Sequence, residues 1–289
     1  MEHSASAGPR RNLGIAAGIL AGFALVLVLS IVSLRWINPP FTAFTLQENW
    51  DALEMDRYSL RENWVSGEEL PEHLKWAVVA SEDQRFWDHR GIDMLAIDDA
   101  LEEFSRGERR RGASTITQQV AKNLYLWPSP SVFRKGIEAG LAVMIDFFWT
   151  KERILEMYLN IAEFGPGIFG VGRAAPVLLS IPPAGLDADA SARLAAVLPS
   201  PKRMRVEPPS PYTVERSRWI LRQMSRLTGS SYLPEPERDT TDLVPDSDPL
   251  PWDFGREPVL DGDEDSTSQA NESIYDRNGV PDSLPDTLR

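Results

Sequence analysis

The stretch from Gly112 to Leu126 reads GASTITQQVAKNLYL and gathers hydroxyls, amides, an Asn and one Lys within fifteen residues. It holds no Cys, His or carboxylate, so it supplies neither a metal-ligand set nor an acid/base pair. Taken alone, the pattern is typical of a Ser- or Thr-capped helix whose polar face is solvated. The reason why so many neutral hydrogen-bonding groups surround one Lys has to come from the other parts of the sequence.

Composition limits the classes of protein that this chain can form. Its 289 residues, 42% of them apolar, suffice for one sizeable domain with appendages, and the lack of Cys excludes a disulfide framework. The net charge of −13 argues against nucleic-acid binding. Most of that charge lies in residues 231–289, where 16 acidic residues face 4 Arg. This segment is rich in Pro, Asp and Ser and is predicted to be a disordered tail.

An uncharged run of 22 residues from Leu13 to Leu34 is long enough to cross a bilayer as a helix. Arg10 and Arg11 precede it, and the positive-inside rule then places residues 1–12 in the cytoplasm. A cleaved signal peptide is the alternative, but its apolar core would be shorter. We therefore expect a single-pass anchor at 13–34 in the cytoplasmic (inner) membrane. Residues 35–70 are expected to form a juxtamembrane segment, and the domain that follows is expected on the periplasmic side.

Apolar residues recur every three to four positions between residues 71 and 230, which predicts a mainly α domain. One helix is expected to start near Pro71 and to stop at Gly91. This helix would place Glu82, Phe86 and His89 on one face.

Two carboxylates lie in largely apolar surroundings. Glu82 follows an apolar run, and Glu138 comes three residues after Lys135. The ordinary interpretations are a solvated Glu at the first position and a local ion pair at the second. The chemical interpretation is a pair for acetal chemistry, in which one carboxyl moves a proton and the other stabilises positive charge.

Four stretches carry a family resemblance: SEDQRFWDHRG, GASTITQQVAKNLYL, RKGIE and KERILEMYLNIAEFGPGIFGV. In this order and spacing, between about Leu74 and Val171, they resemble the peptidoglycan glycosyltransferase domain, family 51. The resemblance implies a lysozyme-like, mainly α-helical domain with a smaller membrane-associated jaw lobe. It also implies polymerisation of lipid II into β-1,4-linked glycan strands, with inversion and release of undecaprenyl pyrophosphate. The chain shows no Ser-x-x-Lys, Ser-Asp-Asn or Lys-Thr-Gly pattern, so no transpeptidase module is expected.

The resemblance also assigns roles to residues. Glu82 matches the catalytic base, and Glu138 matches a second catalytic carboxylate that stabilises the oxocarbenium charge, assists the leaving group or holds a cation. A divalent cation, Mg or Mn, bound with the pyrophosphate is one option, and no resident metal or other cofactor is expected. The expected partners are lipid II, the growing glycan strand and the membrane. Cell-wall synthesis or division proteins are possible further partners, and nucleic acid is not an expected one. The expected substrate-binding residues are Asp83, Phe86, His89, Ser114, Thr115, Gln118, Gln119, Lys122, Asn123, Arg134 and Lys135.

Other features leave alternatives open. A glycan-cleaving enzyme would use a similar lobe, and a degenerate domain would serve as a scaffold. The Arg-rich loop 106–112 is either solvated or attracted to phosphate, and the acidic tail either stays passive or docks on this loop.

After Gly172 the sequence departs from the family, and Pro176, Pro182 and Pro183 are expected to shorten a helix. Aromatic residues at 133 and 147–149 belong either to a buried core helix or to a membrane-dipping surface. Arg153, Glu156 and Asn160 share a helix face, as do Lys151, Leu155 and Tyr158, and both sets are expected mainly to maintain the fold and only secondarily to contact substrate.

Overall fold

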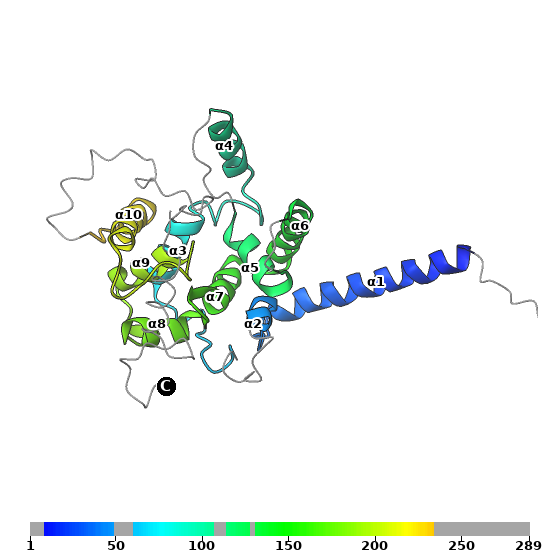
Figure 1. The fold of residues 1–289 in the computed structure, drawn as a ribbon, viewed down its shortest axis with the longest axis horizontal. Coiled ribbons are helices and arrows are strands. Elements are labelled where there is room, and N and C mark those ends of the chain that lie inside the picture. Colours follow the sequence, from blue (N-terminus) through cyan, green and yellow to red (C-terminus); the bar gives the residue numbers. More distant parts are fainter. Residues whose placement is uncertain (1–8, 49–59, 107–113, 128–130, 234–289) are drawn as a thin grey trace, which may run out of the picture.

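The computed structural model describes residues 9–48, 60–106, 114–127 and 131–233, which form a mainly helical body with one long projecting helix (Figure 1). The acidic tail from residue 234 onward and most of the Arg-rich loop lie outside these ranges. The elements in chain order are α1 (Pro9–Leu34), α2 (Ala43–Glu48), α3 (Glu72–Glu82), α4 (Met94–Ser105), α5 (Ile116–Tyr125), α6 (Val132–Phe148), α7 (Lys151–Ile161), β1 (Glu163–Gly165), β2 (Ile168–Phe169), α8 (Val171–Leu179), η2 (Pro183–Gly185), α9 (Ala188–Val197) and α10 (Pro211–Thr228).

The expected anchor is confirmed as a helix. Within α1, the segment Gly14–Leu34 is long and apolar enough to cross a membrane, and it projects from the body as a single rod (Figure 1). Most of its large side chains are exposed, as expected of a helix that faces lipid. Ile31 near its end is the exception, with no exposed surface.

The helix predicted to run from Pro71 to Gly91 is wrong at its end, because α3 stops at Glu82. Asp83 takes an extended conformation, with φ −162° and ψ 77°, and its carboxylate accepts the backbone N–H of Ile116 at 3.0 Å. This contact with the start of α5 turns the chain out of the helix. Glu82, Phe86 and His89 therefore do not share a helix face.

Residues 83–93 form a loop that packs against α6. Gly91 has φ +76°, and a Cβ at this position would lie 2.6 Å from the carbonyl oxygen of Ala142. Only glycine fits this close approach. Phe86 is fully buried, and the Lys151 ammonium lies 4.7 Å from its ring centroid.

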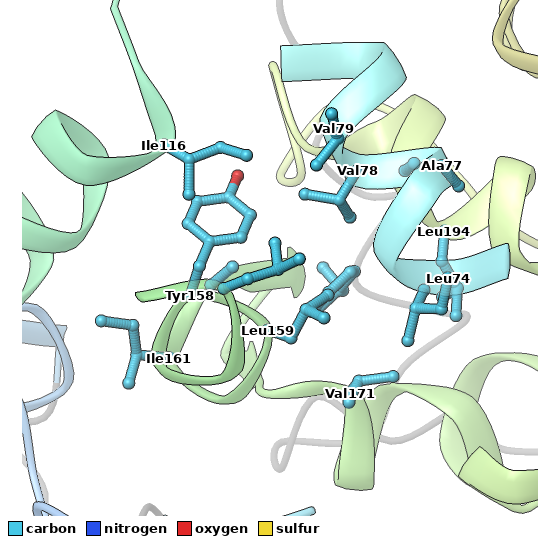
Figure 2. Packing of buried hydrophobic residues seen from close by; sticks show 14 of the residues in the cluster. Leu74, Ala77, Val78, Val79, Ile116, Tyr158, Leu159, Ile161, Val171 and Leu194 are labelled. Carbon is cyan, nitrogen blue, oxygen red and sulfur yellow. The ribbon is translucent and has the colours of Figure 1, made fainter. Parts of the chain in front are cut away.

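One hydrophobic core joins helices that lie far apart in the sequence. Helices α3, α9 and α10 pack together, while α5 packs on both α6 and α7. Figure 2 shows Val78 and Val79 of α3 beside Tyr158 of α7 and Ile116 of α5, so this core joins the two groups of helices. The end of α3 is thereby held against α5.

The segment that departs from the family keeps a short helix. Pro176 lies inside α8, and the helix continues to Leu179. It ends at Ser180, which has a left-handed conformation with φ 56°, ahead of Pro182. The expected shortening therefore comes after Leu179 rather than at Pro176.

The polar residues of α7 have the fold-maintaining contacts expected of them. The Asn160 side chain accepts the backbone N–H of Val65 at 2.8 Å and donates to its carbonyl oxygen at 2.9 Å. Arg153 pairs with Glu156 at 2.8 Å. These bonds dock the segment before α3 onto α7.

Candidate active site

Glu82 ends α3 as a half-buried carboxylate with neutral partners. Its Oε2 accepts a hydrogen bond of 2.8 Å from Gln119 Nε2, and its Oε1 accepts one of 3.2 Å from Ser81 Oγ. Gln119 projects from α5, so the bond joins two helices that the sequence separates. Because no cation forms an ion pair with it among the described residues, this carboxylate can still accept a proton.

Gln119 is oriented by a second hydrogen bond. The hydroxyl of Tyr158 donates to Gln119 Oε1 at 3.2 Å, which leaves the amide nitrogen to face Glu82. Burial raises the pKa of Tyr158 well above 10.0, and the negative charge of Glu82 adds to this rise. Tyr158 therefore keeps its proton and stays a donor.

Glu138 lies on α6 in a different environment. Its side chain is buried, Arg134 Nη1 donates to Oε2 at 2.8 Å, and Lys135 Nζ pairs with Oε1. Lys135 also donates to Ser114 Oγ at 2.7 Å. Both carboxylate oxygens are thus engaged by cations, so Glu138 is poorly suited to accept a proton and well suited to hold two positive groups in place.

Lys122 is the third cation of the site. Its pKa is lowered from 10.5, first by burial and then by the charges of Arg134 and Lys135, while Glu138 and Glu82 act in the opposite direction. Its Nζ lies 5.4 Å from the ring centroid of Phe44 and forms no ion pair or hydrogen bond with other described residues. Within the described ranges, Lys122 therefore offers a positive charge without an ion-pair partner, and both carboxylates influence its pKa.

The other predicted substrate-binding residues are engaged by the protein. His89 Nε2 lies 3.0 Å from each oxygen of Asp83, and Asp83 in turn holds the start of α5. Thr115 and Gln118 form the capping box of α5, and Thr115 Oγ1 donates to the Gly91 carbonyl at 2.6 Å. These side chains shape the loop beside Glu82, and their contact with substrate stays a prediction. Phe86 is buried, and Asn123 is buried one turn beyond Gln119.

Asp146 of α6 connects this helix to the loop that follows Glu82. Its buried carboxylate accepts the backbone N–H of Gly91 at 2.9 Å and pairs with Lys151 at 2.6 Å. The loop that follows Glu82 is thereby tied to the helix that carries Glu138. The sequence did not single out Asp146, because one acid at the end of an apolar run gives no signal, and it predicted mainly a fold-maintaining role for Tyr158.

The residues at hand do not fit a resident divalent cation. The described ranges contain no group of three His, Cys, Asp or Glu side chains that could hold a metal ion, and both oxygens of Glu138 already pair with cations.

The fold and the site together define a membrane-anchored, mainly helical enzyme with two carboxylates among three cations. The chain matches the family model described as Transglycosylase over residues 51–225, more than half of its length, and it belongs to that family. It is 45% identical over 217 residues to a biosynthetic peptidoglycan transglycosylase of Pseudomonas entomophila, covering 74% of this chain and 91% of the relative. Proteins of the same name from Xanthomonas euvesicatoria and Aeromonas hydrophila are 46% identical over 75% of this chain, with 88% and 92% of their own lengths covered. The protein is thus a glycosyltransferase of peptidoglycan synthesis.

Proposed function

We propose that this enzyme polymerises lipid II into β-1,4-linked glycan strands and releases undecaprenyl pyrophosphate. The observation that carries the proposal is that the two carboxylates have different partners. Glu82 accepts hydrogen bonds from neutral groups, whereas each carboxylate oxygen of Glu138 pairs with a cation, Arg134 or Lys135. One carboxylate is thus available to accept a proton, and the other holds cations for a leaving phosphate.

In the proposed step, Glu82 takes the proton from the 4-hydroxyl of the acceptor sugar as that oxygen attacks C1 of the donor. The new C1–O bond forms on the face opposite the leaving group, so an α-linked donor gives a β-linked product. The bond from C1 to the pyrophosphate oxygen breaks, and its electron pair leaves with the lipid pyrophosphate. The proton taken by Glu82 then passes to solvent.

Charge that develops on the pyrophosphate needs positioned cations. Lys122 is unpaired among the described residues, and Lys135 is only partly neutralised because its partner Glu138 also pairs with Arg134. Among the described residues, three cations and one adjacent carboxylate give this side of the site a positive excess. Ser114, a partner of Lys135, adds a neutral hydroxyl of the kind that a phosphate or sugar oxygen can bind.

The proposed location is the outer side of the cytoplasmic membrane, with α1 as the membrane-spanning anchor. Arg10 and Arg11 favour a cytoplasmic N-terminus. A lipid-linked substrate would then reach the site from the bilayer in which α1 is embedded.

Labelled lipid II incubated with the full-length protein in detergent micelles tests this function. Polymer that lengthens with time is the expected result. Shortening of added glycan with no polymer would instead establish a cleaving enzyme. No reaction, with lipid II still bound, would establish a scaffold.

A further inference from the structure

The last turn of α1 packs directly against the helices of the catalytic domain. Ile31 has no exposed surface, and Trp149 at the end of α6 donates its indole N–H to the Ile31 carbonyl oxygen at 2.7 Å. Ser30 Oγ lies 3.2 Å from the hydroxyl of Tyr125, the last residue of α5. The anchor thus contacts both helices that carry the cations of the site.

Two arginines cap helix ends across this junction. The final carbonyl groups of a helix lack intrahelical partners, and a cation beside them is favourable. Arg153 donates to the Leu34 carbonyl oxygen from Nη2 at 2.9 Å and from Nε at 3.2 Å, and to the Ile37 carbonyl at 3.2 Å. In return, Arg35 Nη1 donates to the Phe148 carbonyl at the end of α6, at 2.8 Å. The ends of α1 and α6 are therefore held together from both sides.

Arg153 is itself held in place by α7 and its surroundings. Glu156 pairs with it at 2.8 Å, and the same carboxylate accepts the indole N–H of Trp64 at 2.9 Å. The guanidinium lies 5.4 Å from the Trp64 ring centroid, and its Nη2 also donates to Asn38 Oδ1 at 2.9 Å. A planar guanidinium held in this way donates to several acceptors in one fixed geometry, which the compact ammonium of a flexible lysine does not reproduce.

We infer that the anchor is a rigid extension of the catalytic domain and that Arg153 is the positioning residue that fixes the orientation of the site relative to the bilayer. A flexible tether would let the domain rotate above the membrane. Here the helix that crosses the membrane continues into contacts with α5, α6 and α7. The active site is consequently presented to the membrane in one orientation.

A distance measurement tests the rigidity without using enzyme activity. The chain contains no Cys, so Leu25→Cys on α1 and Glu215→Cys on α10 give two unique spin-label sites in the full-length protein in lipid nanodiscs. Pulsed electron resonance should give one narrow distance distribution, which Arg153→Met broadens and the exposed control Arg226→Met leaves narrow. A broad distribution without either substitution, or a narrow one with Arg153→Met, would overturn the inference.

The consequence for activity rests on the proposed function and needs a second comparison. Arg153→Met should lower the rate on lipid II at least tenfold more in vesicles than in detergent micelles, where no bilayer orients the substrate. Arg153→Lys should recover part of the vesicle rate. An equal loss in both media would show that Arg153 acts on fold stability alone. A narrow distance without any polymerisation by the unmodified protein would contradict the proposed function and leave the rigid anchor standing.

Discussion

The side-chain amide of Gln119 joins the end of α3 to the middle of α5 by donating a 2.8 Å hydrogen bond to Glu82. The buried hydroxyl of Tyr158 fixes which end of that amide faces the carboxylate. The orientation of the proposed base, Glu82, thus depends on three helices. The effect of removing each contact can be measured.

Replacing Glu82 by Gln should reduce polymerisation by about 10²–10⁴-fold, because the amide keeps the shape of the side chain but cannot accept a proton. Binding of lipid II should change little. Glu72→Gln at the exposed start of the same helix is the matched control and should retain full activity. If Glu82→Gln keeps more than a tenth of the wild-type rate in the lipid II assay, another group is the base.

Replacing Tyr158 by Phe should lower kcat by roughly tenfold, equivalent to about 1.4 kcal/mol, while KM stays nearly constant. Without the hydroxyl, the Gln119 carbonyl loses its donor and the amide can turn its oxygen toward Glu82. The free energy of unfolding should also fall by about 1–3 kcal/mol because a partly buried acceptor is left unpaired. Steady-state kinetics and chemical denaturation check both effects. Tyr232→Phe, outside the site, should change neither quantity, and an unaltered kcat for Tyr158→Phe would remove its orienting role.

The lowered pKa of Lys122 predicts an alkaline limb in the pH profile of kcat/KM. As pH rises, Lys122 loses its proton earlier than an ordinary lysine, and the site loses a cation for the pyrophosphate. Tyr158 does not titrate in this range, since its pKa is raised well above 10.0. Lys122→Arg should move this limb to higher pH, because arginine stays charged. The same limb in both proteins would assign it to another group.

Lys122 also links stability to pH. Between its lowered pKa in the folded protein and its ordinary value of 10.5, the unfolded chain holds a proton that the folded chain has lost. The contribution of Lys122 to the free energy of unfolding therefore rises with pH through this window. Comparison with Lys122→Met isolates that contribution, which should be absent from the variant.

Replacing Asp146 by Ala should lower the free energy of unfolding by about 3–5 kcal/mol, because Lys151 would be left largely buried without its partner. The Gly91 amide would lose its acceptor as well. Glu72→Ala breaks an exposed ion pair with Lys75 and should cost less than about 1 kcal/mol. Denaturation of both variants in detergent gives the comparison, and similar losses would contradict a special role for Asp146.

The outer face of α6 is expected to touch the bilayer. Val132, Gly136, Gly140, Val143 and Phe147 form one exposed apolar stripe along this helix. Phe147 is 80% exposed, although Trp149 just beyond it is buried against the anchor. The alternatives of a core helix and a membrane-dipping surface thus apply to opposite faces of one helix.

A protein lacking residues 1–26 keeps the buried turn around Ile31 and should still sediment with vesicles. Phe133→Ser combined with Phe147→Ser should release it, while Leu227→Ser on α10 should not. If the shortened protein stays in the supernatant before any substitution, α1 alone binds the membrane.

Local patterns in the sequence were sufficient for the anchor, the mainly α fold and a Ser- or Thr-capped helix within residues 112–126. An uncharged run, an apolar periodicity and a capping residue each act over a few neighbouring positions, so they can be recognised without tertiary structure. Apolar surroundings singled out Glu82 and Glu138, and the family resemblance added their expected roles. The sequence also showed that Glu138 has Lys135 beside it, since both lie on one helix turn.

Only the tertiary structure decided where α3 ends and what each carboxylate contacts. Asp83 stops the helix by binding the start of α5, 33 residues away, and Gln119 reaches Glu82 across 37 residues. The docking of Ile31 on Trp149 spans 118 residues. No local propensity encodes such contacts, because they form only after the shared core has brought the helices together. The amino-acid sequence therefore determines which chemical groups the site contains, and packing decides which carboxylate keeps neutral partners and can accept a proton.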